Sequence, residues 1–202
     1  AATQTINELF GSKVTVPGTG VLLNNTQQMF DPHPGHALSV QPGKRVTSSM
    51  SPVIVMREGL PEFAVGLPGG VRIFTSVFQA IVNLIDHEMS VQEAVEAPRV
   101  WTQGQEVELE TGISELVMDQ VAEKGHRVMP VNAIGGGMSI VRFEPGGLLS
   151  GASCWRADGH AVGIGGGFAR SGVRFRPSVG EKDPAIVMSE KVAAKTEDED
   201  LV

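Results

Sequence analysis

The spacing of hydrophobic and polar residues predicts a β-hairpin followed by one long amphipathic helix within residues 46–86. Apolar runs at 53–56 and 63–67 flank the tight turn Arg57-Glu58-Gly59, a pattern typical of two antiparallel strands. Polar residues then recur with helical spacing from Arg72 to Asp86 and leave one continuous apolar face. We expect the residues of that face to be buried, namely Phe74, Val77, Phe78, Ile81 and Ile85.

Two glycines stand where this helix should begin, in the sequence Pro68-Gly69-Gly70. The first N–H groups of a helix have no internal acceptor, and the helix dipole is positive at that end. Because glycine has no side chain, an oxygen atom could approach this backbone closely. Such a corner can bind a carboxylate or the oxyanion of an acyl-transfer intermediate. Taken alone, however, a glycine pair is more often an ordinary turn.

The remaining chain predicts shorter elements. Ser90 and Glu93 form a capping box that opens a helix at 91–97. A second amphipathic helix is expected at 113–124, with Leu116, Val117 and Val121 facing inward. Strands are expected at the N-terminus and at 21–23, 106–110, 128–131, 138–143 and 148–153. The loop Gly135-Gly136-Gly137 is interpreted as a turn that could also lie near a pocket.

Composition narrows the class of protein. A chain of 202 residues with 25 glycines and few aromatic residues suits one domain of closely packed sheets. The net charge of −7 without a basic block argues against a nucleic-acid partner. No apolar run reaches the length of a membrane span, and no signal peptide opens the chain. Cys154 is the only cysteine, and we expect a small buried residue rather than a nucleophile.

Seven short motifs resemble the small subunit of the γ-glutamyltranspeptidase family, and they occur in the family's order. Each motif alone is weak, but together and with their spacing they are specific. Two of them are K-R-V-T-S-S-M-S-P at 44–52 and G-L-P-G-G at 66–70. The others are T-I-N at 5–7, F-G-S at 10–12, G-V-L-L-N-N at 20–25, E-A-P-R at 96–99 and G-A-S at 151–153. The resemblance spans residues 1–170, whereas 171–202 predicts a polar, partly disordered tail.

The resemblance implies an α+β N-terminal-nucleophile hydrolase fold, an αββα four-layer sandwich of which this chain supplies the small-subunit part. The chain would lack the first strand of that part. In the family a precursor cleaves itself, and the new N-terminal threonine of the small subunit becomes the nucleophile. That threonine would lie upstream, because Thr3 follows Ala1-Ala2 and has no free α-amine to act as its base. No cofactor or metal is needed for this chemistry.

The resemblance also assigns roles to individual residues. The N–H groups of Gly69 and Gly70 would stabilise the oxyanion. Thr5 matches a threonine that hydrogen-bonds the nucleophile, and Asn7 matches an asparagine that contacts the nucleophile or the substrate carboxylate. Ser48 and Ser49 match a pair of hydroxyls that hold this carboxylate. Without the resemblance, these side chains are ordinary strand, turn and loop residues.

One segment departs from the family pattern. Thr26 takes the first of two positions that bind the α-amino group of a γ-glutamyl donor, and Met29 replaces the aspartate of the second. A methionine cannot pair with an ammonium group. Asp31 is close, but on a strand two residues correspond to about 7 Å. The departure favours a relative of the cephalosporin-acylase or oxamate-amidohydrolase kind, which hydrolyses another acyl amide.

Three other features carry weaker signals. His33 and His36 lie in a proline-rich loop without a nearby cysteine or glutamate, so a solvated surface is favoured over a metal site. Arg99 is expected to form a structural ion pair. The glycines at 163–167 lack the G-K-[ST] ending of a phosphate loop.

The sequence therefore predicts a subunit of an amide hydrolase or acyltransferase. Its expected partners are a small acyl amide with a carboxylate and the large subunit of the same precursor, and this chain alone should be inactive. The alternative is a truncated or degenerate domain that keeps the fold and a carboxylate-binding pocket without catalysis. The sequence leaves open whether homo-oligomers form and whether the protein is periplasmic, secreted or cytoplasmic.

Overall fold

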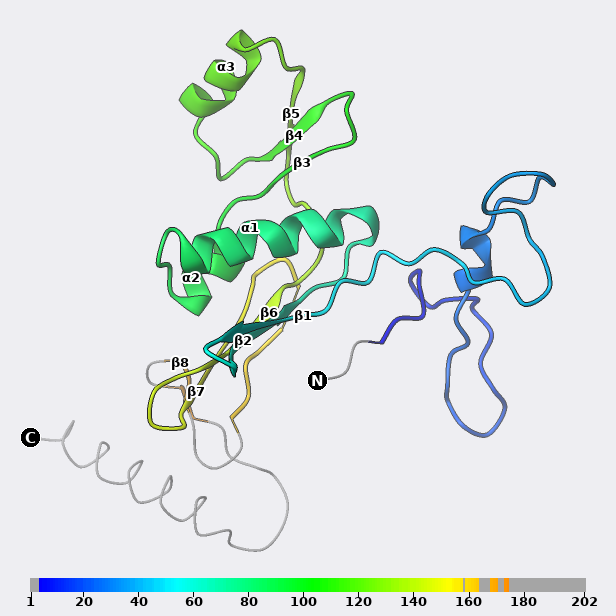
Figure 1. Cartoon of the computed structure of the whole chain (residues 1–202), viewed down its shortest axis with the longest axis horizontal. Coiled ribbons are helices and arrows are strands. Elements are labelled where there is room, and N and C mark those ends of the chain that lie inside the picture. The colour runs from blue at the N-terminus through cyan, green and yellow to red at the C-terminus, as the bar shows by residue number, and fades with distance from the viewer. Residues whose placement is uncertain (1–3, 158, 164–167, 171–172, 175–202) are drawn as a thin grey trace, which may run out of the picture.

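The computed structural model describes residues 4–157, 159–163, 168–170 and 173–174 (Figure 1). Its body is a four-stranded antiparallel sheet with the strand order β1-β2-β6-β7. Helices α1 and α2 cover one face of this sheet (Figure 1). The bounds are β1 Val53–Arg57, β2 Leu60–Gly66, α1 Ile73–Ile85, α2 Val91–Glu96, β6 Ser139–Phe143 and β7 Leu149–Ser153.

The predicted hairpin is confirmed. β1 and β2 pair with Val53 opposite Val65, and Glu58-Gly59 form the turn between them. Glu58 has φ 52° and Gly59 has φ 80°, so both central residues are left-handed, as a tight two-residue hairpin turn requires. The strands predicted at 138–143 and 148–153 correspond to β6 and β7 and complete the sheet.

The core lies between the covered face of the sheet and the two helices. Phe63, Val65 and Ile140 project from the strands toward Val77 and Val95, and all five side chains are buried. One row of paired positions crosses the sheet from Val53 through Val65 and Ile140 to Ala152. Because alternate strand residues point to opposite faces, the intervening row, which includes Ile54 and Val141, stays exposed on the other face.

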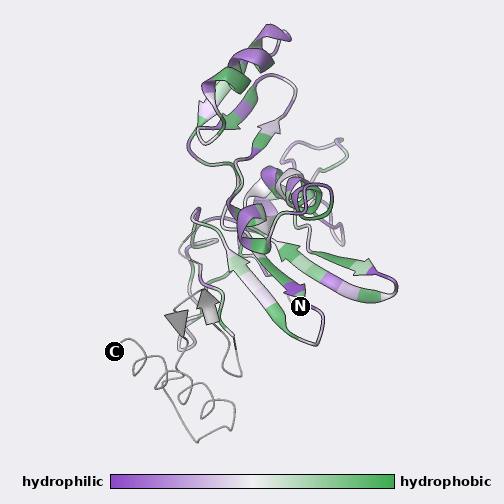
Figure 2. Ribbon diagram, turned by 90° about the vertical axis from the view of Figure 1, so that its left-hand side faces the viewer, coloured by the Kyte–Doolittle hydropathy of each residue, from purple (hydrophilic) through white to green (hydrophobic). Residues whose placement is uncertain are grey.

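The predicted buried face of α1 is wrong in part. Val77 is buried as expected and Ile81 packs against the core, but Phe74 and Phe78 are 59% and 65% exposed. Ile85 is also exposed, at 41%. The face toward the sheet consists instead of Ile73, Ser76, Val77, Ala80 and Leu84. Apolar residues occur around most of this helix, so its pattern does not determine which side meets the sheet (Figure 2).

A second, smaller sheet has the order β3-β4-β5, with bounds Val100–Thr102, Val107–Glu110 and Val128–Val131. Helix α3, Glu115–Glu123, links the parallel strands β4 and β5. The helix and these strands confirm the predictions for 113–124, 106–110 and 128–131. The predicted inward positions are wrong for Leu116 and Val117, which are 67% and 43% exposed, whereas Val121 is partly buried.

Residues 4–52 form an irregular arm that extends beyond the end of α1 (Figure 1). The strands predicted here are wrong. Leu22 makes only an isolated bridge to Thr15, and Met29 ends the 3₁₀ turn η1, Thr26–Met29. The spacing argument for Met29 and Asp31 assumed a strand, so it does not apply to this segment.

The last described pairing is a short hairpin of β8, Phe168–Arg170, with β9, Val173–Arg174. Glycines 165–167 and residues 175–202 lie outside the described residues, so the predictions for the glycine run and the tail stay predictions. Among the helices that the structure describes, none is long and apolar enough to cross a membrane.

The capping box at α2 is confirmed and gives a first testable expectation. The Glu93 N–H donates to Ser90 Oγ at 3.3 Å, and the Ser90 N–H donates to the Glu93 carboxylate at 2.8 Å. Ser90→Ala should cost about 1 kcal/mol of stability, because one helix N–H loses its acceptor. Ser114→Ala is the matched control in a chemical-denaturation measurement, since Ser114 precedes α3 without a side-chain cap. Equal losses in both variants would contradict the assigned cap.

Candidate active site

The segment Pro68-Gly69-Gly70, which we call the glycine corner, joins β2 to the helical segment. Gly70 begins a 3₁₀ turn, η2 Gly70–Arg72, and α1 follows it directly. Gly69 has φ 148° and Gly70 has φ 59°, conformations that L-residues rarely adopt. Within the described residues, neither glycine N–H donates a hydrogen bond. The corner therefore offers two backbone donors at the positive end of a helical segment.

A second glycine segment, Gly135–Gly137, packs directly behind the corner, and we call it the glycine loop. The Gly136 N–H donates to the Pro68 carbonyl at 2.7 Å. A Cβ on Gly69 would lie 2.8 Å from Gly135 Cα, and a Cβ on Gly136 would lie 2.6 Å from Pro68 Cγ. The close approach therefore requires glycine on both sides. The turn predicted for this loop does lie beside the site.

An open groove of about 940 Å³ borders the corner. Ile54, Ala64 and Val141 line it from the exposed face of the sheet. Pro68 and Gly137 line it where the corner meets the glycine loop, and Ile73 lines it from the start of α1. The groove is thus lined mostly by apolar residues, with Gln4, Ser51 and Ser139 as polar ones, a composition typical of small-molecule sites.

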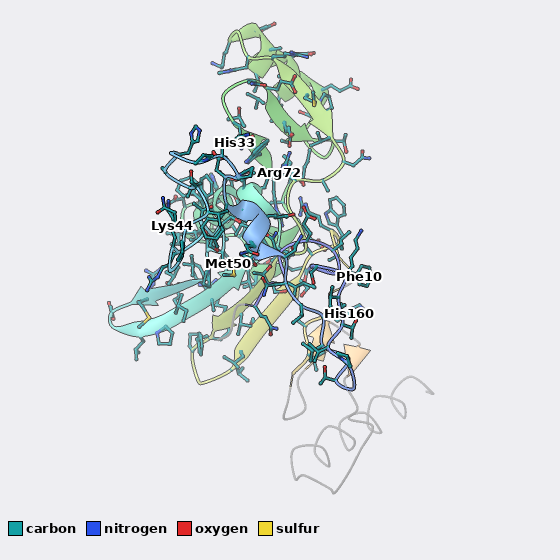
Figure 3. All side chains as sticks on the ribbon, turned by 90° about the vertical axis from the view of Figure 1, so that its right-hand side faces the viewer. Phe10, His33, Lys44, Met50, Arg72 and His160 are labelled. Atoms are coloured by element: carbon teal, nitrogen blue, oxygen red, sulfur yellow. The ribbon has the colours of Figure 1, made fainter. Side chains whose placement is uncertain are left out.

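Arg72, the last residue of η2, connects the turn that follows the corner to the smaller sheet (Figure 3). Its guanidinium donates to Glu108 of β4 through Nη2 at 2.8 Å and Nε at 3.1 Å. It also stacks over the ring of Trp101 of β3, 4.0 Å from the centroid. A bidentate pair and a stacked ring restrict the guanidinium strongly. The sequence indicated Arg72 only as a polar position on a helix.

A buried charge cluster lies behind the glycine loop and centres on Glu110, the last residue of β4. Glu110 is 2% exposed and forms an ion pair with Arg156. Its carboxylate also accepts from the backbone N–H groups of Arg99, at 2.9 Å, and Ile134, at 2.6 Å. Burial alone would raise the pKa of Glu110, but these donors lower it overall. The carboxylate is therefore ionised at neutral pH.

Arg99 is 3% exposed, and its contacts differ from the predicted ion pair. In the described part of the chain, its guanidinium donates to the carbonyls of Ile134, at 2.9 Å, and Gly136, at 3.1 Å. It also contacts Cys154 Sγ at 3.7 Å, whereas Arg156 pairs with the carboxylate. Cys154 is 2% exposed, which confirms the predicted small buried residue.

Three of the predicted site residues meet at the base of the arm. The Asn7 N–H donates to Thr5 Oγ1 at 2.9 Å, and Asn7 Nδ2 donates to Asn25 Oδ1 at 3.1 Å. Thr26 directly follows Asn25, and its N–H donates to Asn24 Oδ1 at 3.0 Å. Gln4, next to Thr5, lines the groove, whereas Thr5, Asn7 and Thr26 are not among its lining residues.

Ser48 and Ser49 lie in the extended segment that enters β1. Ser48 Oγ accepts from the Met50 N–H at 3.2 Å, and the Ser49 carbonyl accepts from Ser51 Oγ at 3.1 Å. Met50 and Ser51 line the groove, and Figure 3 shows Met50 where the arm reaches the sheet. The two serines thus adjoin the groove. No hydrogen bond between described residues joins them to Thr5, Asn7 or the corner.

The two loop histidines, His33 and His36, both lie near the carboxylate of Asp31. His33 Nδ1 lies 2.9 Å from Asp31 Oδ1, and His36 Nδ1 lies 3.9 Å from Asp31 Oδ2. Both imidazoles are mostly exposed. Among the described residues, no three histidine, cysteine or acidic side chains are placed to hold a metal ion.

The α+β fold of this chain recurs in solved transpeptidases and acylases. The γ-glutamyltranspeptidase from Pseudomonas nitroreducens matches with a TM-score of 0.71 and 34% identity, over 81% of this chain and 92% of that chain. The cephalosporin acylase from Bacillus halodurans matches with a TM-score of 0.67 and 31% identity, over 73% of this chain and 28% of that chain.

The chain belongs to the gamma-glutamyltranspeptidase family, whose model matches residues 1–164. It is 58% identical over 175 residues to the acylase ACY 1 proenzyme of Pseudomonas sp. strain SE83, covering 87% of this chain and 31% of that protein. It is 39% identical over 165 residues to the glutathione hydrolase proenzyme of Bacillus subtilis strain 168, covering 80% and 28%. The chain thus spans about a third of the length of these relatives. The resemblance found in the sequence is confirmed.

Proposed function

We propose that this chain is the small-subunit part of an amide hydrolase or acyltransferase whose nucleophile is an N-terminal threonine that precedes Ala1. The observation that carries the proposal is the glycine corner: Pro68 lines one end of an apolar groove, and the N–H groups of the two glycines that follow it donate to no described residue. The described residues supply the binding and stabilising groups, and the preceding chain supplies the nucleophile.

The reaction follows from this division. The threonine hydroxyl attacks the amide carbon while its own α-amine accepts the hydroxyl proton. The N–H groups of Gly69 and Gly70 donate to the oxyanion that forms. The intermediate then expels the amine with a proton and leaves an acyl-threonine ester. Water completes hydrolysis by attacking this ester, and a second amine would complete acyl transfer.

The other candidate residues have supporting roles. Ser48 and Ser49 hydroxyls hold the carboxylate of the acyl group. Thr5 hydrogen-bonds the nucleophile, while Asn7 contacts the nucleophile or the carboxylate and Thr26 contacts the acyl group. The hydrogen bond between Thr5 and Asn7 supports a shared task for these two residues, and Gln4, which precedes Thr5, lines the groove.

The partner is the large subunit of the same precursor, and the complete fold is a four-layer sandwich. The exposed sheet face carries Ile54, Met56, Val141 and Phe143, each at least 41% exposed. A second sheet packed on this face would bury these side chains, as in other two-sheet sandwiches. The relatives named above are proenzymes about three times as long as this chain, which leaves sufficient chain for that layer.

We further propose that the acyl group lacks an α-ammonium. Met29 supplies no anion at the position where the family pattern has an aspartate for the α-amino group of the donor. The sequence identity to an acylase, 58%, also exceeds the identity to a glutathione hydrolase, 39%. Met29→Asp should shift the ratio of kcat/KM toward γ-glutamyl donors by about 10–100-fold, the value of one charged hydrogen bond. Met29→Leu is the matched control and should not shift it. Glutathione as the best donor of the unmodified enzyme would contradict the proposal.

The proposed function is tested on the full-length protein that contains this chain. Mass spectrometry should find a cleaved precursor whose smaller product begins with threonine, and acyl anilides should be turned over. Residues 1–202 alone should be inactive, since Thr3 lacks the free amine. A folded, uncleaved protein without turnover would instead establish the alternative, a domain that only binds ligands.

A further inference from the structure

Among the described residues, the buried charge cluster contains two guanidinium groups, those of Arg99 and Arg156, but only one carboxylate, that of Glu110. Glu110 is engaged by the Arg156 side chain and by two backbone N–H groups. Arg99, 3% exposed, donates to carbonyls and reaches no carboxylate among the described residues. Glu110 acts on Arg99 electrostatically but is itself paired with Arg156, so the cluster keeps one buried cation in excess, which is unfavourable. The remaining group that can become an anion beside Arg99 is the thiol of Cys154, at 3.7 Å.

Cys154 belongs to the hydrophobic core cluster, but the hydrogen-bonding groups that reach its Sγ from the described residues are donors. The Met138 N–H donates to it at 3.2 Å, and the Arg99 guanidinium approaches from another side. A protonated thiol would need an acceptor, whereas a thiolate is satisfied by these groups. Burial raises the pKa of Cys154, but the Met138 and Arg156 N–H groups and the two guanidinium groups lower it overall. The ionisable groups that face the sulfur are thus Arg99 and Arg156, with Glu110 beyond them.

We propose that Cys154 is a thiolate that pairs with Arg99, and that this pair positions the glycine loop behind the glycine corner. The inference deepens the proposed function and rests on it for its catalytic consequence. Cys154 and Arg99 touch no reacting atom in this scheme, so they are positioning residues.

The path from the sulfur to the corner is short. Arg99 donates to the Gly136 carbonyl at 3.1 Å, and the Gly136 N–H donates to the Pro68 carbonyl at 2.7 Å. Cys154 also holds the far end of the loop, because its N–H donates to the Met138 carbonyl at 3.1 Å while its sulfur accepts from the Met138 N–H. Loss of the charge at Cys154 would remove one of the groups that hold Arg99 and would weaken the support of the loop that fixes Pro68.

The charge is tested on the full-length protein by ultraviolet difference spectra of the unmodified enzyme against Cys154→Ser. We expect a thiolate band at pH 7 that titrates below about 8.5, the value of a free cysteine. A band that appears only above that pH would show a neutral thiol and overturn the proposal, whatever the activity. This readout does not depend on the proposed reaction.

The positioning role is tested with the same variants. Cys154→Ser, which removes the charge, should lower kcat by up to about 10²-fold with little change in KM, because the donors are misplaced. Cys154→Asp restores an anion and should restore kcat. Hydrogen exchange at the Gly136 amide should be faster in Cys154→Ser than in the unmodified protein, and unchanged in Cys154→Asp. This expectation holds even if the protein lacks hydrolase activity. Equal exchange in both variants would overturn the positioning role.

Discussion

Replacing Gly70 with valine is expected to lower kcat of the full-length enzyme by about 10²–10³-fold, the usual effect of losing one oxyanion donor. The Gly70 N–H can point toward the reacting carbonyl only while the backbone keeps its left-handed conformation, with φ 59°. A valine avoids that conformation because of its branched Cβ. It would therefore turn the N–H away or place methyl groups where the substrate carbonyl must lie.

The same change also costs stability, so kcat has to be measured beside the melting temperature. A non-glycine residue at positive φ costs about 1–3 kcal/mol wherever it occurs. Gly146→Val is the matched control: Gly146 has φ 84° in the β6–β7 turn, and a Cβ there, as at Gly70, meets nothing within 4 Å. The control should lower the melting temperature similarly and leave kcat unchanged. If both variants lost stability and neither lost kcat, the corner would be only a turn.

Gly70→Ala separates folding from catalysis if the valine variant does not fold. Alanine has a smaller penalty at positive φ than a β-branched residue. A Cβ added at Gly70 would meet nothing within 4 Å, so no other side chain has to move. A folded Gly70→Ala enzyme with reduced kcat and unchanged KM supports the oxyanion role. A folded enzyme with unchanged kcat removes it.

Local features of this fold could be predicted from the sequence because their causes lie within a few residues. The hairpin follows from two apolar runs around Glu58-Gly59, and the α2 start follows from Ser90 and Glu93. The glycine corner was predicted for the same reason, although its 3₁₀ turn was not. In each case the signal and the structure it specifies are adjacent in the chain.

The remaining features depend on contacts between distant segments. Phe74 and Phe78 stay exposed because the sheet packs on another side of α1, which periodicity cannot specify. The glycine loop meets the corner across more than sixty residues of chain. Arg156 reaches Glu110 over 46 positions, and Arg99 reaches Cys154 over 55. The motif E-A-P-R at 96–99 contains Arg99 but does not show what this residue contacts.

The arm shows a different limit. Its first residues alternate as a strand would, yet residues 4–52 contain no strand, and side-chain amides such as Asn25 organise the chain locally. Asparagine side chains offer the backbone alternative partners and favour turns over sheets. The alternation therefore indicates neither pairing with a neighbouring strand nor a buried face, since Leu9 and Val14 are 88% and 54% exposed.

Replacing Glu110 with alanine is expected to lower the free energy of unfolding by about 3–5 kcal/mol, the largest stability loss we predict for a single side chain. Removal of the carboxylate leaves the Arg156 guanidinium, whose side chain is 0% exposed, without its anion. It also leaves the Arg99 and Ile134 N–H groups without their acceptor. Each of these groups would then be buried and unpaired.

Chemical denaturation of the full-length protein at neutral pH measures this loss, with Glu106→Ala as the control. Glu106 pairs with Arg127 at 3.0 Å, but the arginine is 76% exposed, so that change should cost no more than about 1 kcal/mol. The pH dependence follows from the lowered pKa of Glu110. Its contribution is complete above the unfolded-state value of about 4.3 and is lost as the pH falls through the folded-state value. The unmodified protein should therefore have a higher free energy of unfolding than Glu110→Gln at neutral pH, and this difference should disappear only at acidic pH. Similar losses of unfolding free energy in Glu110→Ala and Glu106→Ala at neutral pH would show that the buried pair is not essential to the fold.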